Sequence, residues 1–169
     1  KKYKFQGSGD AWHLNCLEVI NGRLYVSAFC NYKEHYNYKG KTYEKGFLID
    51  VLNGDILIKQ LSQPHTPKFD NGLIYLCDSE TKTLKVFKDN NLINNIELDS
   101  YTRGLYIDSD YIYVGLSKSR NIEDKNATSK IVVLDKNTLK IKSEIPIDLD
   151  EIYNIVSYNE FNIIKNDLS

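Results

Sequence analysis

Short apolar runs separated by turn-forming residues fill almost the whole chain. The runs are rich in Ile, Val, Leu and Tyr, and many of them end at Asn-Gly, Ser-Asp or Asp-Asn-Asn. Asn-Gly between two apolar runs is the strongest short signal for a β-hairpin, because both turn residues tolerate a positive φ. The sequence has no sustained apolar period of 3.6 residues. The pattern therefore predicts an all-β protein.

The predicted strands form three units of two hairpins each. The paired ranges are 17–20 with 23–29 and 47–52 with 55–61, then 67–69 with 73–77 and 84–87 with 92–98, then 105–107 with 111–116 and 131–134 with 139–145. Tyr25, Tyr75 and Tyr113 align in the second strand of each unit, at offsets of 50 and 38 residues. Four-stranded repeats of roughly 40 to 45 residues are typical of a β-propeller.

We therefore expect one β-propeller-type domain over residues 1–169, with about three complete four-stranded blades and a partial fourth. The expected blades are about 12–61, 62–98, 99–147, and a partial blade in which 148–169 pairs with 1–6. Two alternatives stay open for the ring: the chain is a segment of a larger propeller, or several copies form a homo-oligomer that completes it. A β-sandwich is the rival fold, but it does not predict aligned polar residues.

A polar residue stands at the head of the first strand in each unit. Asn15, His65 and Arg103 have the same offsets of 50 and 38, and Glu151 heads a fourth copy 48 residues further on. The first strand of a propeller blade lines the central axis, so these four side chains should meet at one mouth of the channel. The candidate site residues are His65 and Glu151 as catalytic groups and His13, Asn15, Arg103, Asn154 and Trp12 as ligand-binding groups.

The chemistry of this set leaves alternatives open. Arg103 suits a carboxylate or phosphate, which favours a small polar or anionic ligand. His65 and Glu151 can also act as an acid–base pair, or as ligands of a divalent metal beside Asn15 in a hydrolase or lyase. The structural alternative is a hydrated channel in which Arg103 and Glu151 only join two blades.

Two long connections, 31–45 and 118–130, are expected to overhang the same mouth. Loops of this length are often lids or binding loops. The first carries Tyr32, Tyr36, Tyr38 and Tyr43. Because tyrosines offer large amphipathic surfaces, a third hypothesis is a protein- or glycan-interaction module that uses this loop.

Charge and composition narrow the choice of partner. A formal net charge of -1 gives no field that attracts nucleic acid, and no apolar run is long enough to span a membrane. Residues 1–5 lack the apolar core of a signal peptide, so we expect a cytoplasmic protein. The sequence does not begin with Met, which leaves a longer protein or a removed targeting segment open. Three cysteines without CxxC spacing indicate reduced, partly buried thiols.

The chain also resembles a family of bacterial conserved hypothetical proteins. The matching segments are Trp12-His13-Leu14-Asn15, Pro64-His65-Thr66-Pro67, Thr102-Arg103-Gly104-Leu105, Val114-Gly115-Leu116-Ser117-Lys118 and Glu151-Ile152-Tyr153-Asn154. An Arg commonly follows the second proline in that family, where this chain has Lys68. The resemblance implies a propeller, usually longer than this chain, and no assigned reaction. A more distant likeness to gluconolactonase-type propellers and propeller lyases implies Glu, Asn and His residues around a divalent metal, but no motif of theirs is matched.

Overall fold

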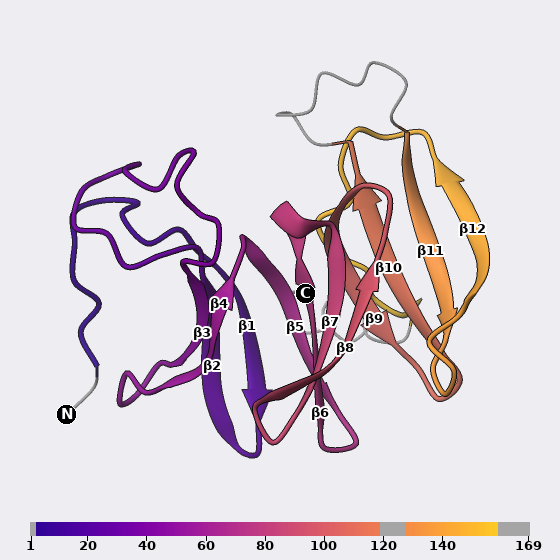
Figure 1. Cartoon of the computed structure of the whole chain (residues 1–169), viewed down its shortest axis with the longest axis horizontal. Coiled ribbons are helices and arrows are strands. Elements are labelled where there is room, and N and C mark those ends of the chain that lie inside the picture. The colour runs from indigo at the N-terminus through magenta and orange to yellow at the C-terminus, as the bar shows by residue number, and fades with distance from the viewer. Residues whose placement is uncertain (1–2, 119–127, 159–169) are drawn as a thin grey trace, which may run out of the picture.

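The chain folds into three four-stranded antiparallel sheets that lie side by side (Figure 1). The computed structural model describes residues 3–118 and 128–158. Within these ranges the sheets are arranged like consecutive blades of a β-propeller and do not close into a ring. The all-β prediction and the propeller-type arrangement of four-stranded blades are confirmed. No helix among the described residues is long and apolar enough to cross a membrane.

Each sheet follows the chain from its inner to its outer strand, in consecutive order. The first sheet contains β1 (Leu14–Ile20), β2 (Arg23–Ala28), β3 (Gly46–Asp50) and β4 (Ile56–Leu61). The second contains β5 (Pro64–Asp70), β6 (Leu73–Asp78), β7 (Thr83–Lys88) and β8 (Asn91–Glu97), with the short 3-10 helix η1 (Ser79–Thr81) after β6. The third contains β9 (Tyr101–Ile107), β10 (Tyr111–Ser117), β11 (Ser129–Asp135) and β12 (Ile141–Ile147).

The Asn-Gly turns have the conformation that their sequence predicts. Asn21 and Gly22 have φ angles of 49° and 76°, and Asn71 and Gly72 have φ angles of 48° and 79°. Positive φ at both central residues fits a type I′ hairpin, whose twist matches that of the flanking strands. These turns therefore fix the register of the inner hairpin in the first two sheets.

The inner hairpins of all three sheets share one register. The residue opposite the aligned tyrosine is Glu18 for Tyr25, Lys68 for Tyr75 and Tyr106 for Tyr113. These partners keep the offsets of 50 and 38 that the tyrosines have. The alignment of the three units drawn from the sequence is therefore the alignment of the sheets.

A β-bulge interrupts each inner hairpin at an equivalent place. It falls between Leu14 and Leu17 in β1, between His65 and Lys68 in β5, and opposite the step from Val114 to Leu116 in the third sheet. A bulge bends its strand and redirects nearby side chains. The bulges thus set the direction of the residues at the heads of the strands.

Apolar side chains from neighbouring sheets form the core. Leu48 and Leu61 of the first sheet pack with Leu76 of the second, and Leu84 of the second packs in a further cluster with Leu116 of the third. All five side chains are at most 1% exposed. Strands β1, β5 and β9 also contact each other in that order, which brings the heads of these strands together.

The outward face of the first sheet is covered by the N-terminal segment. Tyr3, Phe5 and Trp12 pack on the cluster that contains Phe47, and the Tyr3 amide donates a hydrogen bond to the Leu52 carbonyl at 2.6 Å. We expected residues 1–6 to join a fourth blade with 148–169. In the described part of the chain they lie on the first sheet instead, because their aromatic side chains find an apolar surface there.

The segment after β12 crosses the outward face of the third sheet. Residues 151–157 have no regular secondary structure, which differs from the strand expected there. Their path is fixed by Ser117, whose Oγ accepts a hydrogen bond from the Ile152 amide at 2.8 Å. A Cβ atom added to Gly115 would lie 2.7 Å from Cγ2 of Ile152, so the absent side chain makes room for this segment. The rest of the expected partial blade, residues 159–169, lies outside the described residues.

The three cysteines are free thiols, as the sequence indicates. Cys30 and Cys77 are buried, and Cys16 is partly exposed. Burial raises the pKa of the Cys30 and Cys77 thiols above the ordinary value. These two side chains therefore stay protonated and act as small apolar groups in the core.

Candidate functional site

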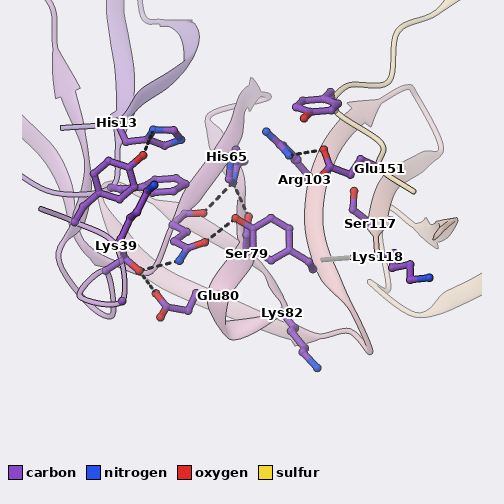
Figure 2. Close-up of a pocket in the computed structure, with 17 residues that line it drawn as sticks. His13, Lys39, His65, Ser79, Glu80, Lys82, Arg103, Ser117, Lys118 and Glu151 are labelled. Carbon is purple, nitrogen blue, oxygen red and sulfur yellow. Dashed lines mark hydrogen bonds and ion pairs between the residues drawn. The ribbon is translucent and has the colours of Figure 1, made fainter. Parts of the chain in front are cut away.

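A cavity of about 790 Å³ lies where the heads of the inner strands meet. Figure 2 shows His65 and Arg103 on neighbouring strands with Glu151 beyond them, and His13 at the opposite side. His65 belongs to β5 and Arg103 to β9, whereas Glu151 follows β12. The register that aligned these residues in the sequence thus brings three of the four heads to one cavity.

The other candidates have different surroundings. The fourth head, Asn15, does not line the cavity, because its Oδ1 accepts a hydrogen bond from the Ser27 hydroxyl at 2.5 Å. Trp12 packs edge-to-face on Phe47 with ring centroids 5.6 Å apart. Asn154 is exposed and its Oδ1 accepts a hydrogen bond from the next backbone amide. Trp12 and Asn154 therefore lie outside the cavity lining, like Asn15.

His65 is held rigidly in the wall of the cavity. Its side chain is buried, and its Nδ1 lies 3.0 Å from the Gln63 carbonyl and 2.7 Å from the Ser79 hydroxyl. The ring packs edge-on to Phe29 and Tyr101, at centroid distances of 5.2 Å and 5.8 Å. Burial, and then the nearby positive charge of Arg103, lower the pKa of His65 to about 3. The imidazole is therefore neutral at physiological pH.

Arg103 is oriented by two residues of the segment that follows β12. Its Nη1 donates to Oε2 of Glu151 at 3.3 Å, and its guanidinium carbon lies 3.7 Å above the ring of Tyr153. Both side chains of the ion pair are largely buried, at 22% and 13% exposure. A stacked and paired guanidinium has little rotational freedom left, so its remaining N–H donors point in fixed directions.

The long loop 31–45 reaches the cavity, as expected. Tyr38, Lys39, Gly40 and Thr42 contribute to the lining. Tyr38 donates a hydrogen bond to Asp10 at 2.9 Å, and the same carboxylate lies 2.8 Å from Nδ1 of His13. One tyrosine of the loop therefore holds His13 in place. Most of the second long connection, residues 119–127, lies outside the described residues.

A chain of hydrogen bonds joins this loop to the strand heads. Thr42 donates to Glu80 at 2.7 Å and accepts from the Gln63 amide at 2.8 Å. The Gln63 side-chain oxygen accepts a hydrogen bond from the Tyr101 hydroxyl at 2.7 Å. Burial raises the pKa of Tyr101 to about 12, which keeps this donor protonated. The chain of bonds links all three sheets, since the loop belongs to the first, Glu80 to the second and Tyr101 to the third.

Sequence reasoning missed one set of equivalent lining residues. Phe29, Ser79 and Ser117 follow or end the second strand of each sheet, and all three line the cavity. They are related by the same offsets of 50 and 38 as the strand heads. The repeat register therefore contained a signal for them. Gln63 and Thr42 had no such signal, because both lie in connections between strands, where the repeat offsets do not apply.

Positive charge exceeds negative charge in the lining. The cationic side chains are those of Lys39, Lys82, Arg103 and Lys118, and the carboxylates are those of Glu80 and Glu151. Both carboxylates already have partners in the protein, Thr42 and Arg103 respectively. The field inside the cavity is therefore suited to an anion.

A metal centre of the gluconolactonase type does not fit this set of side chains. Arg103 occupies one strand head and pairs with the single carboxylate among the heads, Glu151. Asn15 is bonded to Ser27 and lies outside the cavity lining. Within residues 3–118 and 128–158, no group of three or more His, Cys, Asp and Glu side chains is placed to hold a metal ion.

Comparison with known proteins identifies the family. Residues 6–163 match the family described as Domain of unknown function (DUF4915), and the chain belongs to it. No curated protein matches the sequence. Among solved structures the chain is similar to KlHsv2 with loop 6CD replaced by a Gly-Ser linker, with 13% sequence identity and a TM-score of 0.44. The similarity covers 73% of this chain and 36% of that chain, so this chain spans about a third of it.

Proposed function

We propose that this member of the DUF4915 family binds a small anionic molecule in the cavity, with Arg103 as the principal cation. The observation that carries the proposal is the meeting of His65, Arg103 and Glu151 in one cavity whose lining has more cations than carboxylates. Solvation alone does not require a buried imidazole and a stacked guanidinium at equivalent strand heads. A ligand that binds to both groups accounts for this arrangement.

Arg103 has the donors that such a ligand needs. Of its guanidinium nitrogens, only Nη1 forms a hydrogen bond to a described residue, Glu151. A guanidinium has five N–H donors in a planar fork that matches the oxygens of a carboxylate or phosphate. The Tyr153 ring covers one face of the fork, so an anion approaches along its edge. Glu151 thus acts here as a positioning residue for Arg103.

The volume of the cavity favours a small molecule. About 790 Å³ lies within the 300 to 1,000 Å³ that is common for sites of small ligands. Lys39 comes from the loop 31–45 and Lys118 from the end of β10, so cations approach the ligand from opposite sides. A second charged group on the ligand would find a partner at either side.

Isothermal titration calorimetry with four probes tests the proposal: inorganic phosphate, glycerol 3-phosphate, gluconate and citrate. At least one probe should bind the wild-type protein, and Arg103→Gln should weaken its binding about tenfold or more, since hydrogen bonds to charged groups contribute about 1.5 to 3 kcal/mol. Added salt should weaken binding in the wild type.

Lys142→Gln is the matched control. It removes the same single charge from a side chain that is 55% exposed on β12 and does not line the cavity. Its affinity for each probe should stay within a factor of about two of the wild type, because exposed charges contribute little. Failure of all four probes to bind, or equal losses in the two variants, would overturn the proposal.

A further inference from the structure

The hydrogen bonds of His65 determine which of its ring nitrogens carries the proton. Nδ1 lies 3.0 Å from the Gln63 carbonyl oxygen, which can only accept a hydrogen bond. The Ser79 hydroxyl, 2.7 Å from the same nitrogen, donates its own proton to the Thr102 carbonyl. Both neighbours of Nδ1 are therefore acceptors, and Nδ1 carries the hydrogen.

The remaining nitrogen is consequently an acceptor. In a neutral imidazole one nitrogen donates and the other accepts, so Nε2 of His65 has the free lone pair. Burial and the charge of Arg103 hold the pKa of His65 far below its ordinary value, which keeps the ring neutral. No hydrogen bond to Nε2 is formed within the described part of the chain.

The ring cannot turn to satisfy Nε2 elsewhere. Phe29 and Tyr101 pack edge-on to it at centroid distances of 5.2 Å and 5.8 Å. A half-turn of the ring would also break both hydrogen bonds of Nδ1, to Gln63 and Ser79. Nε2 forms no bond to a described residue and is not sealed in the core, so it lies at the wall of the cavity that His65 lines. An acceptor at the cavity wall must keep its water or gain another donor, and a ligand with a donor group satisfies it.

Cation and acceptor lie in the same cavity. Arg103 is close enough to His65 for its charge to lower the pKa of the imidazole. An anion at Arg103 that also carries a hydroxyl group can donate that hydroxyl to Nε2. A second anionic group at this place would face a lone pair and be repelled.

We propose that the ligand is a hydroxylated small anion, whose hydroxyl group donates a hydrogen bond to Nε2 of His65 while its carboxylate or phosphate binds Arg103. This inference rests on the anion-binding function proposed above and adds the substrate class. Sugar phosphates and sugar acids both have this chemistry. His65 then discriminates between ligands by hydrogen bonding and Arg103 by charge.

Two ligand pairs test the inference, and they show whether the anionic group is a phosphate, as in sugar phosphates, or a carboxylate, as in sugar acids. Glycerol 3-phosphate is compared with propyl phosphate, and gluconate with hexanoate, by titration calorimetry on the wild-type protein. The hydroxylated member of at least one pair should bind about tenfold tighter or more, because a site built around a hydroxyl rejects the analogue that lacks it. In His65→Phe this ratio should fall to about one.

A spectroscopic measurement on the unmodified protein keeps the inference falsifiable if His65→Phe fails to fold. Long-range ¹H–¹⁵N correlation spectra of the imidazole should show hydrogen on Nδ1 and a free lone pair on Nε2. The hydroxylated ligand should shift the Nε2 resonance, and its deoxy analogue should not. A proton on Nε2 in the free protein would overturn the inference.

The outcomes also distinguish this inference from the proposed function. If anions bind through Arg103 but both members of each pair bind equally, the hydroxyl-directed role of His65 is wrong and anion binding stands. If no anion binds the wild type, both are wrong. If the ratio persists in a folded His65→Phe variant, another group recognises the hydroxyl and the inference fails.

Discussion

The hydroxyl of Thr66 donates a hydrogen bond to the carbonyl of Arg103 at 2.5 Å, across the boundary between the second and third sheets. Thr66 lies in the bulge of β5 with a φ angle of 42°, which is unfavourable for a β-branched residue. The contact holds the backbone of Arg103 beside the strand that carries His65. Local strain in the second sheet is thus compensated by a bond that positions the site.

We expect Thr66→Val to destabilise the protein by about 1 to 2 kcal/mol, because it keeps the side-chain shape and removes the donor to Arg103. Urea unfolding measures the change. Thr66→Ser keeps the hydroxyl and loses the β-branch, so it should be at least as stable as the wild type. Equal stability of the Val and Ser variants would show that the hydrogen bond contributes nothing.

The stability of the protein should depend on pH through His65. The folded-state pKa of about 3 lies below the ordinary value of 6.5, so between these two values only the unfolded chain takes up the proton. The free energy of unfolding should therefore fall as the pH drops below about 6.5, by at most about 1.4 kcal/mol per pH unit. Above pH 7 this contribution is complete and constant.

Urea unfolding of the wild type and His65→Gln from pH 7.5 to pH 5 isolates the effect. The other histidines are common to both proteins and cancel in the difference. Asp10 and Asp108 have lowered pKa values, since their hydrogen bonds outweigh the effect of burial, and they stay ionised in this range. The wild type should lose more stability than the variant on acidification. Parallel pH profiles would mean that the imidazole is not buried as a neutral group.

Much of the fold could be predicted from the sequence because local signals and repeat signals agreed. The Asn-Gly turn at Asn71 fixes one hairpin, and the offsets that relate Tyr25 to Tyr75 also relate the residues paired with them. Side chains at equivalent places in a repeat share a direction, so His65 and Arg103 could be expected in one cavity. They line it together.

Which of the other candidate side chains face the cavity could not be predicted, because this depends on contacts that produce no repeating pattern in the sequence. Trp12 stands beside His13 in the sequence, yet it packs on Phe47 while His13 lines the cavity. His13 has a φ angle of 50°, a left-handed backbone conformation directly before β1. Asn15 is at an equivalent strand head, but its side-chain oxygen accepts a hydrogen bond from the neighbouring Ser27 hydroxyl. Register predicts a place in the fold, and local hydrogen bonds decide whether the side chain faces the ligand.

The loop 31–45 should be held over the cavity by Thr42. Its hydroxyl donates to Glu80 and accepts from Gln63, and the residue is 1% exposed. Thr42→Val should break both bonds and loosen the loop. Limited trypsin digestion should then cleave after Lys39 or Lys41 several-fold faster, as followed by mass spectrometry. Thr42→Ser keeps the hydroxyl and should be cleaved at the wild-type rate; equal rates for the two variants would remove Thr42 as the anchor.

Trp12 should matter for stability and not for binding. It packs against Phe5 and Phe47 on the outward face of the first sheet, away from the cavity lining. Trp12→Ala should lower the free energy of unfolding by about 2 to 3 kcal/mol, less than for a fully buried aromatic residue. Its affinity for the tightest-binding probe should stay within about twofold of the wild type. A tenfold loss of affinity without loss of stability would place Trp12 in the site after all.

Gly115 should control the position of Glu151, because Gly115 packs against Ile152, the next residue in the chain after Glu151. A Cβ added at Gly115 would lie 2.7 Å from Cγ2 and 3.1 Å from Cβ of Ile152, so Gly115→Ala must push the segment away from β10. Because Glu151 and Tyr153 flank Ile152 and orient Arg103, anion affinity should fall. Calorimetry should find a loss of several-fold in Gly115→Ala.

Adding Ile152→Ala removes Cγ2 and should restore part of the affinity, although stability falls further because Ile152 is buried. If the double variant binds as weakly as Gly115→Ala, steric displacement of this segment is not the cause.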